Sequence, residues 1–226
     1  MNFPNIIYED ENLLVVDKPA GLVVNKSETT KDITLEDLLI EKYNLTGSTT
    51  EFEQRKGIVH RLDKDTSGVL LIAKDERTYE EIKAQFMDRD IAKEYIALVY
   101  GEVKDKEFEI AAPIGRNPEN KRKMIVSQSG KTAVTKFELI KNIKLVSGDY
   151  ALLKVLPKTG RTHQIRVHLA AYGHSVVGDV IYVSSHVLSK SASDFSRMML
   201  HAKSIEVFYR DEKRLFVSTS YSDFDL

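Results

Sequence analysis

Short apolar runs rich in β-branched residues recur along the chain, and turn-forming or polar segments separate them. This pattern is typical of a protein built mainly from short strands. Two such runs flank a Pro-Ala-Gly turn within residues 12–25, and the run VLLIA occupies residues 69–73. Five further strands are expected, with the sequences KEYIALVYG, KTAVTKFELI, DYALLKVLP, MMLHAKSIEVFY and KRLFVS. The strands do not alternate one for one with helices, which argues against a doubly wound parallel sheet.

Three segments have helical spacing instead. Thr34 and Asp37 resemble a capping box that opens one helix, and Asp75 is expected to cap a second. RTHQIRVHLAAYG predicts a third helix, ended by its last glycine, whereas residues 44–57 are interpreted as a polar loop. The sequence therefore predicts an α+β fold: a mixed, mostly antiparallel central β-sheet with flanking helices and loops. At 226 residues and 42% apolar content, we expect one domain covering residues 1–226.

Several function classes lack their sequence signals. There is no cysteine for disulfides or thiolate metal sites, and no HExxH, GxxxxGK[ST], GxGxxG or GxSxG motif occurs. His163, His168 and His174 are five and six residues apart, so one helical face cannot gather them around a metal. We therefore expect no metal and no cofactor.

Membrane and export signals are also missing. No stretch reaches the ~18 apolar residues of a membrane span, and MNFPNIIYED has neither the basic nor the apolar region of a signal peptide. The expectation is a cytoplasmic protein without a membrane partner.

The net charge of −1 hides an uneven distribution of charge. Residues 116–136 contain six Lys or Arg against one acid, and residues 151–178 contain no acid at all. A single basic run is usually a solvated face, but two such runs favour a polyanionic partner.

The stretch HRLDKDTSG, residues 60–68, concentrates the candidate chemistry. Its alternating oxygen-bearing residues before a glycine resemble the opening of a calcium loop. The twelfth position counted from Asp63 is Lys74, however, where calcium requires a bidentate glutamate. Strand-like runs also replace the flanking helices of such a loop. Calcium binding is therefore rejected.

Asp63 and Asp65 form a possible carboxylate pair. On an extended segment their Cα atoms would lie roughly 6 to 7 Å apart and both side chains would point the same way. Such a pair could act as acid and base on a glycosidic bond. Nearby arginines and lysines favour ionised carboxylates, whereas a general acid must hold a proton. One ionised carboxylate, as nucleophile or electrostatic stabiliser, fits better, with the second acid capping the turn.

GIVHRLDKDTSGVLLIAK resembles the signature segment of the RluA family of RNA pseudouridine synthases. Further segments similar to the family follow in the family's order across nearly the whole chain. They are ENLLVVDKPAGL, KEYIALVYG, APIGRNPENKRKM, GKTAVTKFEL, TGRTHQIRVHLAAYGHSVVGD and MLHAKSIEV. The resemblance implies a monomeric uridine isomerase that acts on ribosomal or transfer RNA in a basic cleft, with neither metal nor cofactor.

The resemblance also implies roles for individual residues. Asp63 matches the catalytic aspartate, Tyr95 the tyrosine that packs on the base, and Arg166 the arginine that pairs with the catalytic carboxylate. Arg61 is expected to occupy the space left by the flipped uridine. The remaining expected substrate-binding residues lie in the same two motifs and are His60, Thr66, Arg161, His163 and Gln164.

Two other functions remain open: a catalytically silent RNA-binding module and a nucleoside or glycoside hydrolase. The family often has a separate N-terminal S4 RNA-binding module, whereas the catalytic pattern begins here within the first dozen residues. We therefore expect a catalytic domain without that module. The serine-rich stretch VIYVSSHVLSKSASDFSRMMLHA departs from the family pattern, so the RNA contacts expected there are not assigned to residues.

Overall fold

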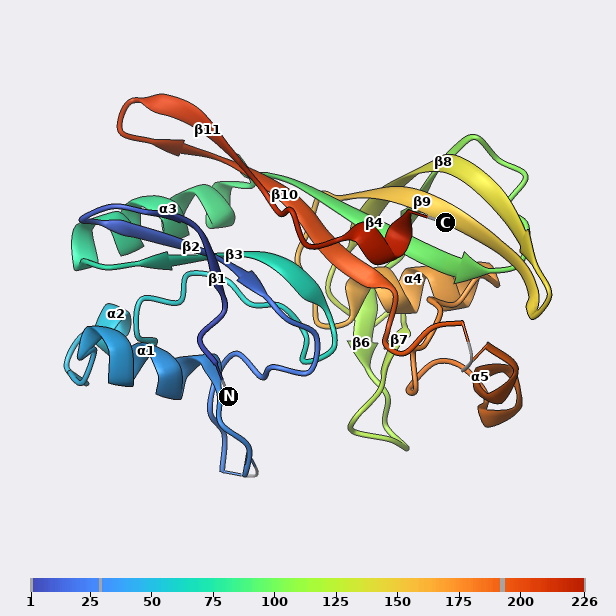
Figure 1. The fold of residues 1–226 in the computed structure, drawn as a ribbon, viewed down its shortest axis with the longest axis horizontal. Coiled ribbons are helices and arrows are strands. Elements are labelled where there is room, and N and C mark those ends of the chain that lie inside the picture. The colour runs from blue at the N-terminus through green and yellow to red at the C-terminus, as the bar shows by residue number, and fades with distance from the viewer. Residues whose placement is uncertain (1, 29, 192–193, 226) are drawn as a thin grey trace. The chain divides into compact units, whose positions relative to one another are not determined.

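The computed structural model describes residues 2–28, 30–191 and 194–225 (Figure 1). The chain forms two compact units, each assembled from segments distant in sequence. The first unit comprises residues 1–92 and 202–221, and the second comprises residues 93–201 and 222–226. Residues 192 and 193 of the serine-rich stretch lie outside the described residues. No helix among the described residues is long and apolar enough to cross a membrane.

The first unit is built on antiparallel strand pairs. β1 (Asn5–Glu9) pairs with β2 (Leu13–Lys18), which pairs in turn with β3 (Ser67–Ala73). β10 (Leu200–Tyr209) follows β3 in the strand order, and β11 (Glu212–Val217) pairs with β10. Every residue of β2 and β3 is buried, which explains why both strands are almost continuously apolar in sequence.

Local capping chemistry sets where the helices of this unit begin. α1 (Leu35–Tyr43) begins after Thr34 with a capping box to Asp37, and α3 (Glu76–Asp88) begins after Asp75, whose carboxylate accepts from the Thr78 amide. α2 (Glu51–Gln54) is one short turn with its own capping box. Ile82 of α3 belongs to a buried cluster with apolar residues of β2, β3, β10 and β11.

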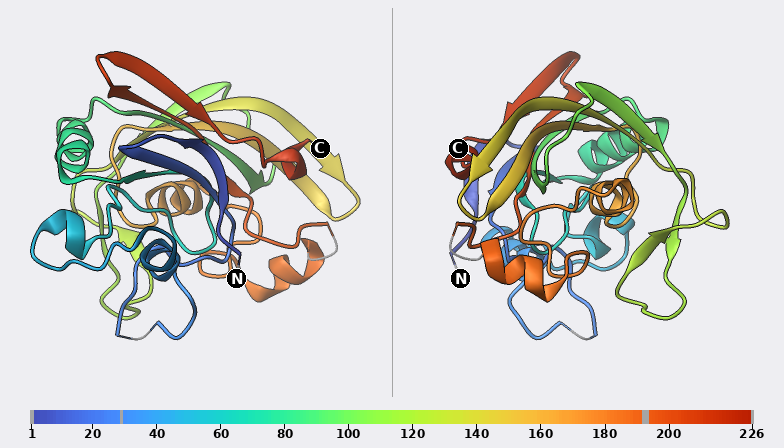
Figure 2. Two further views of the ribbon diagram at one scale, coloured as in Figure 1. Left: turned by 60° about the vertical axis from the view of Figure 1, so that its left-hand side comes forward. Right: turned by 90° about the vertical axis from the view of Figure 1, so that its right-hand side faces the viewer.

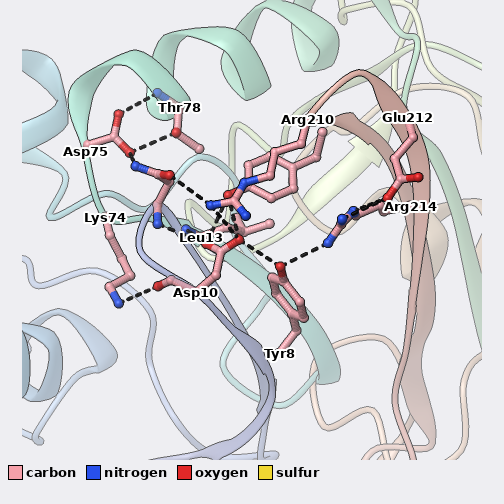
Figure 3. Close-up of polar contacts among 11 residues, drawn as sticks. Tyr8, Asp10, Leu13, Lys74, Asp75, Thr78, Arg210, Glu212 and Arg214 are labelled. Carbon is pink, nitrogen blue, oxygen red and sulfur yellow. Dashed lines mark hydrogen bonds and ion pairs between the residues drawn. The ribbon is translucent and has the colours of Figure 1, made fainter.

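A polar cluster around Asp10 holds the β1–β2 turn (Figure 3). The Asp10 carboxylate accepts hydrogen bonds from the amides of Asn12 and Leu13 at 2.9 and 2.8 Å, and from the hydroxyls of Tyr8 and Tyr209. Burial alone would raise the pKa of Asp10, but these hydrogen bonds outweigh it and lower the pKa to about 2. The cluster thus ties the N-terminal hairpin to β10 through an ionised carboxylate.

In the second unit, β4 (Ala92–Tyr100), β9 (Gly148–Pro157), β8 (Val134–Leu145) and β5 (Glu107–Ala111) are neighbours in that order and pair antiparallel. α4 (Gln164–Tyr172) packs Ile165 and Leu169 into the core of this unit. The short elements are α5 (Ser185–Ser191) and the 3-10 turn Ser222–Phe224. β6 (Ile114–Arg116) and β7 (Met124–Val126) form a separate hairpin that projects from the rest of the unit (Figures 1 and 2).

The predicted α+β class with mostly antiparallel strands is confirmed. The three predicted helices and most of the predicted strands are present. The second strand predicted within residues 12–25 is wrong, because Val23 forms only an isolated bridge with Thr34. Residues 44–57, interpreted as a loop, contain α2. The expectation of one domain for residues 1–226 stays a prediction.

Candidate active site

The signature segment forms a tight turn between two buried anchors. The Asp63 carbonyl accepts a hydrogen bond from the Thr66 amide at 3.2 Å, so residues 63–66 form a turn. The carboxylates of Asp63 and Asp65 both project from this turn. The prediction that both residues lie on an extended segment is therefore wrong. Leu62 and Thr66 are buried at the two ends of the turn, whereas Arg61 is exposed and Asp63 is half-buried. The turn thus presents Arg61 and Asp63 from a fixed backbone.

A buried lysine supports this turn. Lys18 at the end of β2 has no exposed surface, and its Nζ donates to the carbonyls of Pro19, Leu22 and Lys64 at 2.9, 2.9 and 3.0 Å. The Lys64 carbonyl also accepts from the Gly21 amide. The Pro-Ala-Gly turn and the signature turn are therefore joined through the Lys18 Nζ atom.

The charge of Lys18 is set by opposing effects. Burial lowers the pKa of Lys18 to about 7, while the negative charges of Asp65 and Asp63 act in the opposite direction. Both aspartates therefore lie within electrostatic reach of a cation that solvent does not screen. Sequence reasoning missed Lys18, although it stands in the segment ENLLVVDKPAGL, and an ionisable residue inside an apolar strand was the available signal.

His60 uses one ring nitrogen within this unit. Its Nε2 accepts a hydrogen bond from the Leu71 amide at 3.0 Å, which requires that nitrogen to be unprotonated. The ring also stacks on Phe86 of α3, with centroids 4.8 Å apart. An RNA contact by His60 would therefore have to use another part of the ring.

Gly68 ends the signature where the backbones approach closely. Its φ is +114°, and a Cβ at this position would stand 2.2 Å from the Ala202 carbonyl oxygen. Only glycine fits there without moving β10, so the signature turn ends at the closely packed strands β3 and β10.

The other candidate residues lie in the second unit. Tyr95 of β4 stands opposite Val155 of β9 and packs partly buried against the core of the unit. Burial lowers the pKa of Lys93, two residues earlier, whose Nζ lies 3.9 Å from where a Gly160 Cβ would stand. Asp63 belongs to the first unit, so its predicted pairing with Arg166 stays a prediction.

Gln164 is fully engaged inside the second unit. Its amide nitrogen donates to the Val134 carbonyl and the Thr135 hydroxyl, and its amide oxygen accepts from Thr159 and from the Arg161 amide. The side chain is buried, and these four bonds fill its donor and acceptor capacity. A substrate contact by Gln164 would have to replace one of them.

Arg161 and His163 lie directly before α4. His163 precedes the helix in the left-handed conformation with φ 54°, and its Nδ1 lies 2.9 Å from the Tyr182 hydroxyl. Arg161 is half-buried, and its Nε donates to the Thr132 carbonyl at 3.0 Å. Non-glycine residues with positive φ cost free energy and are common at functional sites.

Arg166 forms a buried bidentate ion pair with Asp179. The Arg166 Nε and Nη2 donate to the two Asp179 carboxylate oxygens at 2.7 and 2.8 Å, and both side chains are almost completely buried. Sequence reasoning assigned no role to Asp179. Its position could have drawn attention to it, because it is the first acid after the acid-free residues 151–178.

The basic runs differ once their ion pairs are known. Lys136, Lys154 and Lys158 each pair with one or more glutamates of β4, β5 or β8. The β6–β7 hairpin instead carries exposed Arg116, Lys121 and Arg122. Within the two predicted basic runs, the three paired lysines are thus neutralised by glutamates, whereas the hairpin cations are exposed.

Comparison with known proteins identifies the family of the chain. The sequence model of the RNA pseudouridylate synthase family matches residues 12–171, which include the signature turn, Tyr95 and Arg166. The chain belongs to this family.

Individual relatives are similar over most of the chain. It is 42% identical over 205 residues to "Ribosomal large subunit pseudouridine synthase D" of Zymomonas mobilis, covering 87% of this chain and 62% of the relative. It is 44% identical over 182 residues to an "Uncharacterized RNA pseudouridine synthase" of Aquifex aeolicus, covering 80% and 57%. The chain thus spans about three fifths of the length of these curated relatives.

A solved human structure, "RNA Pseudouridylate Synthase Domain Containing 1", matches with a TM-score of 0.77 and 29% identity. The match covers 97% of this chain and 85% of the human one. The α+β fold is therefore that of a pseudouridylate synthase domain.

Proposed function

We propose that this chain isomerises a uridine in RNA to pseudouridine, with Asp63 as the catalytic carboxylate. The observation that carries the proposal is the signature turn: it presents Asp63 from a backbone held by buried Lys18, within the residues that match the family. Ribosomal and transfer RNA are both candidate substrates. The name of the Zymomonas mobilis relative favours ribosomal RNA.

The reaction needs charge and confinement and consumes no reagent. The C1′–N1 bond breaks, the uracil turns, and C1′ bonds to C5, while the C5 proton leaves and N1 gains a proton. An ionised Asp63 can attack C1′ as a nucleophile or remove a sugar proton to give a glycal. Either route requires a carboxylate that is charged and fixed in position.

Arg166 and Tyr95 are the proposed partners of Asp63. An arginine beside the carboxylate would keep it ionised and oriented, and the buried setting of Arg166 supports a strong interaction. The Tyr95 ring would stack on the uracil, with its hydroxyl as the proposed acceptor of the C5 proton. Both assignments rest on the family match, which includes these two residues.

Access to C1′ requires the uridine to leave its stack, at a cost of a few kcal/mol. Arg61 is exposed on the signature turn and can fill the vacated space, because a guanidinium both stacks on bases and binds phosphate. The exposed cations of the β6–β7 hairpin would bind phosphates independently of sequence. We propose that the protein acts as a monomer in the cytoplasm.

Tritium release tests the proposal. RNA labelled at C5 of uridine should release tritium without free uracil in the presence of the protein, and Asp63→Asn should lower the single-turnover rate at least about 100-fold with the fold intact. Asp65→Asn is the matched control, because it lies in the same turn near the same lysine, and should cost less than about fivefold.

The other outcomes separate the alternative functions. Free uracil would indicate a nucleoside or glycoside hydrolase. RNA binding without either product would indicate a silent binding module. Equal loss from both aspartate variants would restore the carboxylate dyad.

A further inference from the structure

Fold stability alone does not explain the buried ion pair between Arg166 and Asp179. Arg166 is the third residue of α4, where the helix dipole disfavours a cation, and the first turn of α4 contains no acidic residue. Its guanidinium is also buried, so removing it from water is costly. A buried ion pair can often be replaced by apolar residues without loss of stability. Its presence therefore indicates a role for the orientation of the arginine.

Asp179 is itself held in place. Its Oδ1 accepts from the amides of Ile181 and Tyr182 at 2.9 and 3.2 Å, in addition to Arg166. Gly178 precedes it with φ +75°, and a Cβ there would stand 2.3 Å from the Arg197 carbonyl oxygen. The carboxylate is thus fixed by backbone groups, and its bidentate contact permits the Arg166 guanidinium only one orientation.

Tyr182 contacts both Arg166 and His163. The Arg166 Cζ lies 5.2 Å from the centroid of the Tyr182 ring. The Tyr182 hydroxyl lies 2.9 Å from His163 Nδ1 and accepts from the Met124 amide of β7 at 2.9 Å. The segment from Gly178 to Tyr182 therefore contacts both candidate residues at the start of α4 and the basic hairpin.

We propose that Asp179 is a positioning residue for the isomerisation. It holds Nε and Nη2 of the Arg166 guanidinium in one orientation, and the proposed role of Arg166 in keeping the reacting carboxylate ionised requires a fixed guanidinium. Asp179 contacts neither RNA nor the reacting atoms in this account. The inference rests on the proposed function, because it assigns a cause to the orientation of a proposed catalytic arginine.

The first test measures how firmly the Arg166 guanidinium is held, and it does not depend on an activity assay. The Arg166 Nε–Hε resonance in a ¹⁵N NMR spectrum, assigned by its loss in Arg166→Lys, should exchange slowly with solvent in the wild-type protein. In Asp179→Asn it should exchange at least about tenfold faster, because an amide NH2 group replaces the carboxylate oxygen that accepts from Nε while the remaining oxygen keeps the bonds from Nη2 and the backbone amides. Unchanged exchange would refute the contact as the fixing element.

The second test reads the consequence for catalysis. In Asp179→Asn the single-turnover rate of tritium release should fall about 100-fold, the size expected for a misplaced catalytic group, while the Kd for RNA changes less than about threefold. If this variant does not fold, Asp179→Glu replaces it. Glutamate keeps the charge but displaces the guanidinium, so the same loss of rate is expected.

Two controls separate positioning from general damage. Leu153→Ala removes a buried side chain from the core of the same unit and so lowers its unfolding midpoint. Asp223→Asn removes a different ion pair, the more exposed one with Arg197. Both should keep rates within about threefold of wild type when measured well below their midpoints. An equal loss of rate in Leu153→Ala, or a wild-type rate in the folded Asp179 variant, would overturn the inference. Absence of tritium release from the wild-type protein would instead refute the proposed function.

Discussion

Replacing the buried Lys18 by methionine should change how stability depends on pH. The Lys18 ammonium has no exposed surface, and burial lowers its pKa from 10.5 to about 7, against the opposing charges of Asp65 and Asp63. Between these two values the unfolded chain binds a proton that the folded protein does not bind. The free energy of unfolding therefore gains a contribution from Lys18 that is present above pH 10.5 and is lost as the pH falls through about 7.

The magnitude follows from the size of the shift. A shift of about 3.5 units corresponds to about 5 kcal/mol in total, at about 1.4 kcal/mol per pH unit. Between pH 7.5 and pH 9.5 the free energy of unfolding of the wild-type protein should rise by about 2.5 kcal/mol relative to Lys18→Met. Methionine has a similar length and no titrating group, so it removes this difference in proton binding.

Urea unfolding followed by far-UV circular dichroism at several pH values measures the effect, since the chain contains no tryptophan for fluorescence. Lys31→Met, an exposed lysine of the same unit, is the matched control and should run parallel to wild type. If the wild-type and Lys18→Met curves also run parallel, Lys18 remains charged throughout. Its three carbonyl acceptors and the two aspartates would then outweigh burial, and the reasoning would be refuted.

Two further predictions concern the same unit. Asp10→Asn should cost about 2 kcal/mol at neutral pH, because the folded-state pKa of Asp10 is about 2 against an ordinary 3.8; the stabilisation is present above pH 3.8 and is lost as the pH falls through 2. Wild type and variant should therefore converge in acid, and a constant difference in urea unfolding from pH 2 to pH 7 would contradict this. Gly68→Ala should cost about 3 kcal/mol or more, since its Cβ would strike the Ala202 backbone, whereas Gly21→Ala, also at positive φ but with no atom within 4 Å, should cost about 1 kcal/mol. Equal losses of unfolding free energy in the two glycine variants would show that the close approach to β10 does not matter.

The starts of α1 and α3 were predictable because their capping signals are local, whereas α4 has no side-chain cap and was predicted from its apolar spacing. Thr34 with Asp37, and Asp75 before α3, form the expected caps, and each pairing spans three residues. α2 carried the same signal in Thr50 and Glu53. It was missed because one turn of polar residues has no apolar stripe to separate it from a loop.

The strand expected after the Pro-Ala-Gly turn was wrong for a non-local reason. Val23 and Val24 are β-branched and buried or half-buried, as in a strand. The neighbouring Leu22 carbonyl, however, accepts from the buried Lys18 ammonium, and Val23 meets Thr34 only as an isolated bridge. A side chain contributed by β2 therefore binds a backbone group in the segment that was expected to be a strand. Sequence periodicity does not record such a contact.

The sequence predicted the residue types of the candidate site. It did not predict which of these side chains are turned to the core. The segment HQIRVH supplied three expected site residues, His163, Gln164 and Arg166. Gln164, however, shares one face of α4 with His168, which lies four residues later. Gln164 donates to the Thr135 hydroxyl, Thr135 lies 3.0 Å from His168 Nδ1, and His168 Nε2 donates to the Ala112 carbonyl. The carbonyl can only accept, so Nε2 carries the proton and Nδ1 accepts from Thr135.

Burial also lowers the pKa of His168, although its bond to Ala112 opposes the shift, which agrees with this neutral ring. The chain of hydrogen bonds therefore has one consistent direction and belongs to the interior of the second unit. Arg166, two residues from both Gln164 and His168, projects from a different side of the helix, where Asp179 meets it. Spacing along a helix can thus predict which polar residues share a face. Whether a face is turned to the core or to a ligand depends on residues outside the helix, here Thr135 for the face of Gln164 and Asp179 for the side of Arg166.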